Sequence, residues 1–179
     1  MPQRHLFSGD DVRRLIVELA NRLAPSERRD IVIAGGSLLA LHGLRDSTAD
    51  VDSLTLLDTT LSEHIAVMAA HHDLRGDWLN DHAHPYSPHG LTMQQCNVLL
   101  EHRGFRLLGV PLHLVFLMKL DRAQEQDVAD MVRLWPIVSS AFRDVSHVVN
   151  EYFAAYPNAR EDPYLEQFLA EIVCRSDPR

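Results

Sequence analysis

The sequence predicts an α/β protein (α+β) in which a mixed sheet flanked by helices is followed by a helical C-terminal bundle. About the first hundred residues combine short β-branched runs with amphipathic helical patterns, whereas about the last seventy show helical periodicity alone. The length of 179 residues suits one domain with a helical appendage. We therefore expect a first domain over residues 1–110 and a helical region over residues 111–179 that packs on it.

The N-terminal part of the chain predicts an amphipathic helix over about residues 9–23. Ser8 and Asp11 have the spacing of a capping box, and the apolar residues after them recur at helical intervals. Pro25 and Ser26 would end this helix.

The next segment predicts two strands joined by a short helix. The β-branched run over residues 30–34 stops at Gly35-Gly36, which is typical of a buried strand that ends in a turn. Ser37 is expected to cap a short helix over residues 38–42. Residues 49–57 are expected to form the second strand.

The middle of the chain predicts a helix and then a long loop. Thr60 and Glu63 have capping-box spacing, at the start of a helix whose apolar face carries Leu61, Ile65 and Met68. Residues 71–90 are rich in His, Asp and Pro, and predict a loop with one short strand near Trp78.

A β-hairpin and a set of helices complete the prediction. Residues 91–100 and 105–110 are expected to be strands, with residues 102–104 as their turn. Pro111 suits the first turn of a helix, and Pro136 is expected to lie just beyond another. The expected helices cover about residues 111–122, 126–135, 145–156 and 165–172.

The composition predicts a protein of the cytoplasm. The chain is 46% hydrophobic and contains no apolar run of the roughly 18 residues that suggest a membrane span. Its N-terminus lacks the apolar core of a signal peptide. Cys96 and Cys174 are the only cysteines, and a chain of this length buries a core without disulfides, so we expect a reducing compartment.

One feature of the basic residues is unusual. Of 17 basic residues, Lys119 is the only lysine, and all the others are arginine. Lysine carries a compact charge on a flexible stem, whereas arginine presents a planar fork. We therefore expect Lys119 to occupy a site that arginine does not fit, with chance as the alternative.

The Gly35-Gly36-Ser37 turn has the composition of an anion-binding turn. A strand that passes through glycines into a helix exposes backbone N–H groups, and these donors favour a phosphate together with the helix dipole. The glycines allow a phosphate to approach closely, and the hydroxyl of Ser37 adds a donor.

Asp50 and Asp52 predict a metal site beside this turn. On one strand their side chains share a face, with Cα atoms roughly 6–7 Å apart. Two carboxylates so close repel each other unless a cation lies between them, and hard oxygen ligands suit Mg²⁺ or Mn²⁺ bridged to substrate phosphates. Because one short helix separates the turn from the aspartates, both are expected to face one pocket.

The stretch GGSLLALHGLRDSTADVD, residues 35–52, resembles the signature of the nucleotidyltransferase fold that DNA polymerase beta-like enzymes share. The order of residues in this stretch is most similar to that in the branch that contains abortive-infection and mycobacterial-type nucleotidyltransferase toxins. A second block, PLHLVFLMKLDRAQEQDVADM at residues 111–131, resembles the helix pair of that branch. Residues 1–110 would then be the catalytic domain.

The resemblance implies roles for the residues of the first block. Asp50 and Asp52 would bind the divalent metal ions, Mg²⁺ or Mn²⁺. Gly35, Gly36 and Ser37 would hold the phosphates of a nucleoside triphosphate.

The resemblance also implies roles for three residues elsewhere. Lys119 would contact the triphosphate, and Asp127 would either lie near the attacking hydroxyl or orient Lys119. Arg45 would reach a phosphate or hold its loop in place. The second block departs from its relatives because it has no arginine directly before Asp127.

The implied reaction is nucleotidyl transfer. A hydroxyl attacks the α-phosphate of a nucleoside triphosphate in line, and pyrophosphate leaves. In the toxin branch the acceptor is often the 3′ end of tRNA, and such toxins usually occur with a cognate antitoxin. The general base is unassigned, because polymerase-like members carry a third carboxylate for which Glu101 and Asp58 are the candidates here.

Two alternatives of other kinds stay open. The first is a nucleotidyltransferase that acts on a small molecule or a protein hydroxyl, which the net charge of −8 favours over broad nucleic-acid binding. The second is a catalytically silent binding or regulatory protein of the same fold, which the unassigned base favours.

Two further groups of residues have alternative explanations. The His and Asp residues of the 71–90 loop would bind zinc or, as we favour, form a solvated, pH-sensitive loop. Tyr152, Phe153 and Tyr156 would stack on bases or, as their helical spacing favours, pack in the core. The stripe that contains Phe168 and Leu169 is expected to be core or a partner surface.

Overall fold

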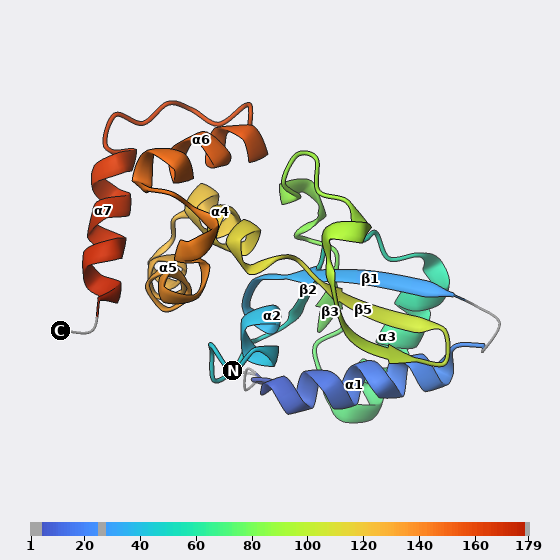
Figure 1. Ribbon diagram of the computed structural model, residues 1–179. Helices are drawn as coiled ribbons and strands as arrows, with labels where there is room; N and C mark the ends of the chain where they lie inside the picture. Colours follow the sequence, from blue (N-terminus) through green and yellow to red (C-terminus); the bar gives the residue numbers. More distant parts are fainter. Residues whose placement is uncertain (1–4, 25–27, 178–179) are drawn as a thin grey trace. The chain divides into compact units, whose positions relative to one another are not determined.

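The computed structural model describes residues 5–24 and 28–177, and its chain trace is shown in Figure 1. These residues form two compact units. The first unit contains the described residues up to 86 together with residues 92–110, and the second contains residues 87–91 and those from 111 onwards. The predicted end of the first helix, at Pro25 and Ser26, lies outside the described residues.

The first unit is built on a mixed five-stranded sheet with the order β3-β2-β1-β5-β4. Strand β1 is antiparallel to β2 and parallel to β5, and β5 is antiparallel to β4. The mixed sheet with helices and the helical C-terminal part confirm the predicted α/β class. The strands are β1 Arg29–Ala34, β2 Val51–Ser53, β3 Leu79–Asn80, β4 Asn97–His102 and β5 Phe105–Gly109.

Three helices accompany this sheet: α1 Gly9–Arg22, α2 Gly35–Leu41 and α3 Thr59–His72. The capping box of α1 is present as predicted, with the Ser8 hydroxyl accepting from the Asp11 backbone and the Asp11 carboxylate accepting from Ser8. Figure 1 shows α1 running along one face of the sheet. That helix buries an apolar stripe made of Val12, Leu15, Ile16, Leu19 and Ala20.

Strand β2 is much shorter than the predicted strand over residues 49–57. The Ser53 hydroxyl donates to the carbonyl of Thr55 at 2.7 Å and accepts from the Thr55 backbone at 2.9 Å. The Thr55 hydroxyl in turn accepts from the backbone N–H of Val32 at 3.0 Å. These local side-chain bonds replace the strand ladder and turn the chain out of the sheet.

Both predicted caps in this region were wrong. Ser37 does not precede α2, because that helix begins at Gly35 with Ala34 as its N-cap. The capping box at Thr60 does not form, because Asp58 caps α3 by accepting from the backbone of Leu61 at 2.9 Å. In each case the helix begins one or more residues earlier than the pattern predicted.

The predicted hairpin forms, but its first strand begins later than expected. Residues Met93–Gln95 form a 3₁₀ turn, so only Asn97–His102 pair with β5. Arg103 and Gly104 have φ values of 51° and 83°. Positive φ at both positions is what a two-residue hairpin turn of the primed type requires. A short strand follows Trp78 as predicted, and a second 3₁₀ turn covers His84–Tyr86.

The second unit is helical, as the sequence predicts. It contains α4 Leu112–Arg122, α5 Glu125–Val138, α6 Val145–Ala155 and α7 Leu165–Ser176, with a 3₁₀ turn over Ser139–Ala141. Helix α5 was expected to end before Pro136, but it continues through it. Pro136 lies in the last turn, so the helical hydrogen bond that its missing N–H removes affects only the end of the helix.

An aromatic cluster and a buried stripe fill the core of the second unit. The rings of Phe116, Trp135 and Phe142 are in mutual contact, with centroids 5.6–6.2 Å apart. Tyr152 and Leu169 are buried, which confirms the core explanation for both, whereas Phe153, Tyr156 and Phe168 are half-buried.

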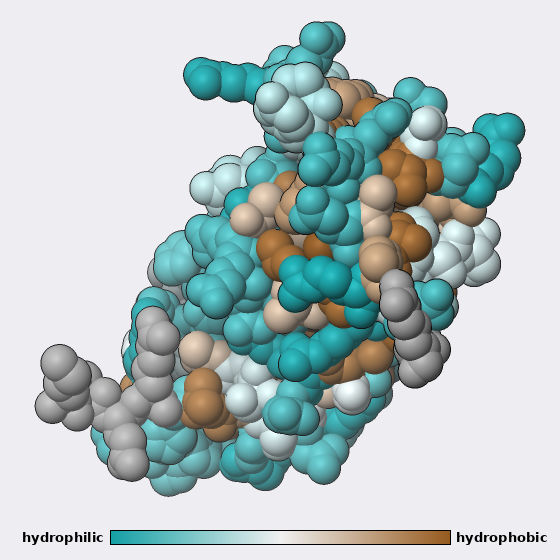
Figure 2. All heavy atoms as spheres, turned by 90° about the vertical axis from the view of Figure 1, so that its left-hand side faces the viewer, coloured by the Kyte–Doolittle hydropathy of each residue, from teal (hydrophilic) through white to brown (hydrophobic). Residues whose placement is uncertain are grey.

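Within residues 5–24 and 28–177, no helix combines the length and apolar character needed to cross a bilayer. On the face shown in Figure 2, hydrophobic residues form small patches among hydrophilic ones. Both cysteines have free thiols.

Candidate functional site

The glycine turn and the second aspartate of the pair lie against each other. In the sheet register Ala34 of β1 is the partner of Asp52 of β2, so Gly35, the residue after Ala34, begins α2 beside that carboxylate. Gly35 has a φ of +67°, and a Cβ built there would lie 3.2 Å from Oδ2 of Asp52. Glycine therefore supplies both the conformation and the space that this approach requires.

Gly36 makes room for two polar side chains of the following loop. A Cβ built on Gly36 would lie 2.8 Å from Nη1 of Arg45 and 2.9 Å from Oγ1 of Thr48. The guanidinium of Arg45 thus lies directly over the glycine turn, within reach of an anion bound there. Arg45 itself is half-buried.

Thr48 holds this loop in place. It forms a backbone bridge with Phe7, with N–O distances of 2.7 and 2.9 Å, and its hydroxyl donates to the carbonyl of Asp50 at 2.9 Å. Thr48 is 3% exposed, so the loop is anchored at a point between Arg45 and Asp50. The sequence analysis did not single out Thr48, although its place between Arg45 and Asp50 was a usable signal.

Asp50 and Asp52 differ in how the fold presents them. Both are half-buried, but only Asp52 belongs to β2, while Asp50 lies in the bend just before it. The prediction that one regular strand carries both is therefore wrong.

Ser37 is less available than predicted. Its side chain is 1% exposed, and its hydroxyl donates to the carbonyl of Ala34 at 3.2 Å. The side chain therefore supports the turn from inside. A role for this residue in phosphate binding stays a prediction.

Neither candidate for a third carboxylate is a sheet neighbour of Asp52. Glu101 lies on β4, and the strands β1 and β5 separate β4 from β2. Asp58 caps α3 and forms an ion pair with Arg29 at 2.8 Å. Glu101 therefore lies on a strand that does not pair with β2, and the carboxylate of Asp58 is already paired with Arg29 and the start of α3.

The actual neighbour of Asp52 on β3 is Asn80, which the sequence analysis missed. Asn80 is 5% exposed, and its amide donates to the carbonyl of Asp77 at 3.2 Å and accepts from the backbone of His82 at 2.9 Å. The sequence indicated this position only through the predicted short strand near Trp78. That prediction did not say which residue of the strand would pair with Asp52.

The carboxylates of Asp50 and Asp52 fit a magnesium or manganese ion by the chemistry of their donors. Hard cations of this kind take one or two protein carboxylates and complete their shell with water and substrate phosphates. Among the residues that the structure describes, no group of three or more His, Cys, Asp or Glu side chains is placed to hold a metal. In the histidine-rich segment, Nδ1 of His84 lies 2.6 Å from the Leu54 carbonyl and Nε2 of His72 lies 2.7 Å from Oε2 of Glu18.

The lone lysine lies in the second unit, in a buried ion cluster between α4 and α5. The Nζ of Lys119 is 2.8 Å from Oδ1 of Asp127 and 2.8 Å from Oδ2 of Asp130. The side chain of Lys119 is 4% exposed and both carboxylates are 0% exposed. A compact ammonium thus bridges two carboxylates in a space that excludes solvent, which explains why arginine is absent here.

Arg122 completes the pairing of Asp127. Its Nε is 2.6 Å from Oδ2 of that carboxylate. The arginine that relatives carry before the aspartate is thus replaced by an arginine from the last turn of α4. Burial would raise the pKa of Asp127, but the hydrogen bonds from Arg122 and Lys119 together outweigh burial and lower it. Asp127 therefore stays ionised, in contact with Lys119.

The predicted residues fall into two groups, one in each unit. Gly35, Gly36, Arg45 and Asp52 gather around one turn of the first unit, and Asp50 lies in the bend before β2, where its carbonyl accepts from Thr48. Lys119 and Asp127 form the ion cluster of the second unit. No protein-family model, no curated protein and no solved structure matches this chain. The functional conclusion therefore depends on the site's own residues.

Proposed function

We propose that the chain is a metal-dependent nucleotidyltransferase that transfers a nucleotide from a nucleoside triphosphate to an RNA hydroxyl, at the 3′ end of tRNA. The observation that carries the proposal is the contact between the glycine turn and the carboxylate of Asp52, with Gly35 directly beside it. Phosphate donors and a metal carboxylate on one turn are what a bound metal–triphosphate needs.

Each residue of the turn has a chemical task in this proposal. Asp50 and Asp52 would hold Mg²⁺ or Mn²⁺, which neutralises phosphate charge and lowers the pKa of the attacking hydroxyl. The backbone after Ala34 would donate to phosphate oxygens, and Arg45, over Gly36, would pair with the leaving pyrophosphate. Lys119 is paired with Asp127 and Asp130 within the second unit, and its contact with the triphosphate stays a prediction.

The reaction forms one phosphorus–oxygen bond and breaks another. The acceptor oxygen attacks the α-phosphorus, the bond to the bridging oxygen of the pyrophosphate breaks, and the acceptor proton passes to solvent or to the leaving group. No carboxylate of the first unit is assigned as the general base.

A transfer assay tests this proposal. Purified protein is incubated with Mg²⁺, total tRNA and each α-³²P-labelled nucleoside triphosphate in turn, beside Asp52→Asn and the matched control Asp46→Asn, an exposed carboxylate of the same loop. We expect label on tRNA with the wild type and with Asp46→Asn, and none with Asp52→Asn. No label on tRNA from any triphosphate would reject the RNA acceptor.

The same assay separates the alternative acceptors. Label on protein or on a small molecule would support the other nucleotidyltransferase hypothesis, which the net charge of −8 favours. A toxin of this type would arrest growth when expressed alone, and a cognate antitoxin protein would relieve the arrest. Growth arrest by Asp52→Asn as strong as that by the wild type would rule out a toxic transfer reaction.

A silent binding protein is the second candidate function. It is favoured by Asn80, an amide, as the β3 neighbour of Asp52, and by the pairing of Lys119 with two carboxylates. Titration calorimetry with Mg²⁺ and a nucleoside triphosphate distinguishes the candidates. Binding without transfer to any acceptor would favour the silent protein.

A further inference from the structure

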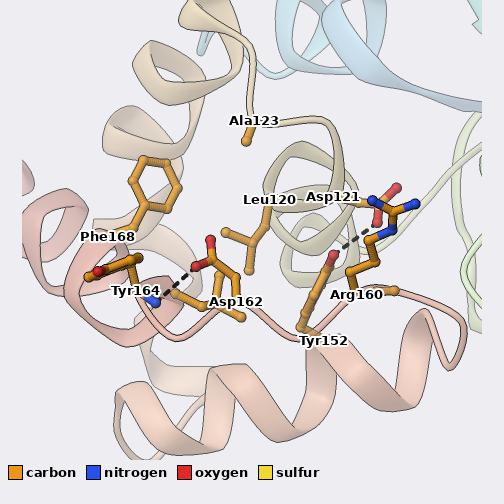
Figure 3. A pocket seen from close by; sticks show the side chains of 10 residues that line it. Leu120, Asp121, Ala123, Tyr152, Arg160, Asp162, Tyr164 and Phe168 are labelled. Carbon is orange, nitrogen blue, oxygen red and sulfur yellow. Dashed lines mark hydrogen bonds between the residues drawn. The ribbon is translucent and has the colours of Figure 1, made fainter.

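A pocket in the second unit has no role in the site described above. It has a volume of about 570 Å³ and lies between α4, α6, the start of α7 and the segment that joins α6 to α7 (Figure 3). Pockets of this size hold small ligands. Its lining includes Asp121, Tyr152, Arg160, Asp162, Tyr164 and Phe168.

One end of the pocket is aromatic. Tyr164 and Phe168, four residues apart at the start of α7, line this end, and Leu120 lies nearer the middle of the pocket (Figure 3). Tyr164 is 70% exposed, the largest exposed fraction among the large hydrophobic residues that the structure describes. An exposed ring beside a second ring provides a surface on which a flat heterocycle can stack.

The other end is polar and carries both signs of charge. The Tyr152 hydroxyl donates to Oδ1 of Asp121 at 3.0 Å, and the side chain of Arg160 extends toward that carboxylate (Figure 3). Burial, followed by the hydrogen bond to Asp121, raises the pKa of Tyr152 to about 12, so the hydroxyl stays a donor at neutral pH. The guanidinium of Arg160 has no hydrogen bond or ion pair with any residue in the described part of the chain.

A third polar group lies between the two ends. Oδ1 of Asp162 accepts from the backbone N–H of Tyr164 at 2.9 Å, which fixes the carboxylate in the pocket wall. A ligand that fills the pocket would therefore need a flat ring, donors for two carboxylates, and an acceptor for an arginine.

We propose that this pocket binds one nucleotide unit. Its base would stack on Tyr164 and Phe168, its sugar hydroxyls would donate to the carboxylates, and its phosphate would pair with Arg160. An organic cation would leave Arg160 unpaired, and an apolar ligand would cover the second oxygen of each carboxylate without offering it a donor.

Two sources supply this chemistry: a free mononucleotide and the unpaired end of a single-stranded RNA. The inference stands on the pocket's own residues and does not require nucleotidyl transfer. If RNA is the source, the pocket would hold a nucleotide of the acceptor, a reading that rests on the proposed function.

Binding measurements on the intact protein in EDTA test the inference. Calorimetry with AMP and fluorescence anisotropy with a short labelled single-stranded oligoribonucleotide cover the two sources. The variants are Tyr164→Ala and Arg160→Ala. Their matched controls are Tyr86→Ala, a tyrosine that is 62% exposed in the first unit, and Arg143→Ala, an exposed arginine of the second unit.

We expect Tyr164→Ala to weaken binding roughly 5- to 100-fold, because loss of one stacking platform has effects of that size. Arg160→Ala should weaken AMP binding and abolish its salt dependence, which should be shallow because a single arginine meets a single phosphate. AMP binding as tight as that of the oligonucleotide indicates the free nucleotide, and oligonucleotide binding alone indicates RNA.

The result that overturns the inference is distinct from a failure of the proposed function. If neither probe binds at millimolar concentration, or if Tyr164→Ala binds as the wild type does, the pocket is not a nucleotide site. Asp52→Asn should bind both probes normally. Tyr164-dependent binding together with an absence of transfer would reject the transfer reaction alone.

Discussion

The ammonium of Lys119 lies 2.8 Å from a carboxylate oxygen of Asp127, and both side chains are almost entirely removed from solvent. A buried ion pair offsets the desolvation of its charges only when its partners are all in place. Lys119 has two carboxylate partners and Asp127 has two cationic ones, so the loss of one member leaves charge without compensation.

The first prediction concerns the stability of the second unit. Lys119→Met should lower the free energy of unfolding by about 3–5 kcal/mol, because it leaves Asp127 and Asp130 as buried carboxylates with weaker pairing. Urea unfolding followed by circular dichroism measures the change, with Arg175→Met, an exposed residue of α7, as the control. Unchanged stability together with lost transfer would instead assign Lys119 a purely chemical role.

The second prediction concerns pH and Asp127. Burial has the largest single effect on the pKa of this carboxyl and raises it. The hydrogen bonds from Arg122 and Lys119 together outweigh burial, so the pKa in the folded protein is below its ordinary value of 3.8. The unfolded chain then binds more protons than the folded one near that pH. The stabilisation is therefore complete above about pH 5 and is lost as pH falls through the lowered pKa.

The measurement compares wild type with Asp127→Asn. The difference in their free energies of unfolding should be constant from neutral pH to about pH 5 and should shrink below the ordinary value of 3.8. Val115→Ala, a non-titrating change at a buried position of α4, should give a difference that does not vary with pH. An Asp127→Asn difference that stays constant down to pH 3 would contradict the ionised state assigned to this carboxyl.

The third prediction reverses a general rule about glycine in helices. Gly→Ala within a helix usually stabilises it by up to about 1 kcal/mol. At Gly9, the first residue of α1, a Cβ would lie 2.5 Å from the backbone carbonyl oxygen of Ala40 in α2. Gly9→Ala should therefore destabilise the first unit by roughly 1–3 kcal/mol, because α1 and α2 must separate.

The control for this prediction is Gly76→Ala. No atom lies within 4 Å of a Cβ built on Gly76, and its φ is not positive, so alanine there should be neutral or slightly stabilising. Thermal unfolding of both variants measures the contrast. Equal melting temperatures for the two would show that α1 and α2 do not approach as closely as the structure describes.

Local patterns predicted the parts of the site that depend on local sequence. The β-branched run before Gly35 and the glycines after it were sufficient to place a buried strand, a turn and a short helix. The capping box at Ser8 was predicted for the same reason, since it depends on residues three positions apart.

Tertiary pairing decided what local patterns could not. The place of Asn80 beside Asp52 depends on a strand of two residues, which has no periodicity to detect. The short length of β2 is associated with the bond from the backbone N–H of Val32 to the Thr55 hydroxyl, which joins two segments far apart in the sequence. Lys119 was singled out by composition, but its carboxylate partners appear only when α4 packs on α5.

The last prediction tests the contact on which the proposed function depends. Gly35 and Gly43 have nearly equal positive φ values, 67° and 69°, so alanine at either position should cost about 1–2 kcal/mol of backbone strain. They differ in their surroundings. A Cβ on Gly35 meets Oδ2 of Asp52 at 3.2 Å, whereas nothing lies within 4 Å of a Cβ on Gly43.

The two variants should therefore match in stability and differ in binding. Gly35→Ala must displace the Asp52 carboxylate by a few tenths of an ångström, which would weaken a metal–triphosphate complex at least tenfold, since metal ligands must be held closely in place. Gly43→Ala should bind the complex as the wild type does. Calorimetry with Mg²⁺ and a nucleoside triphosphate, paired with urea unfolding, measures both quantities. Equal affinities in variants of equal stability would mean that the approach of Gly35 to Asp52 serves the fold and not a bound nucleotide.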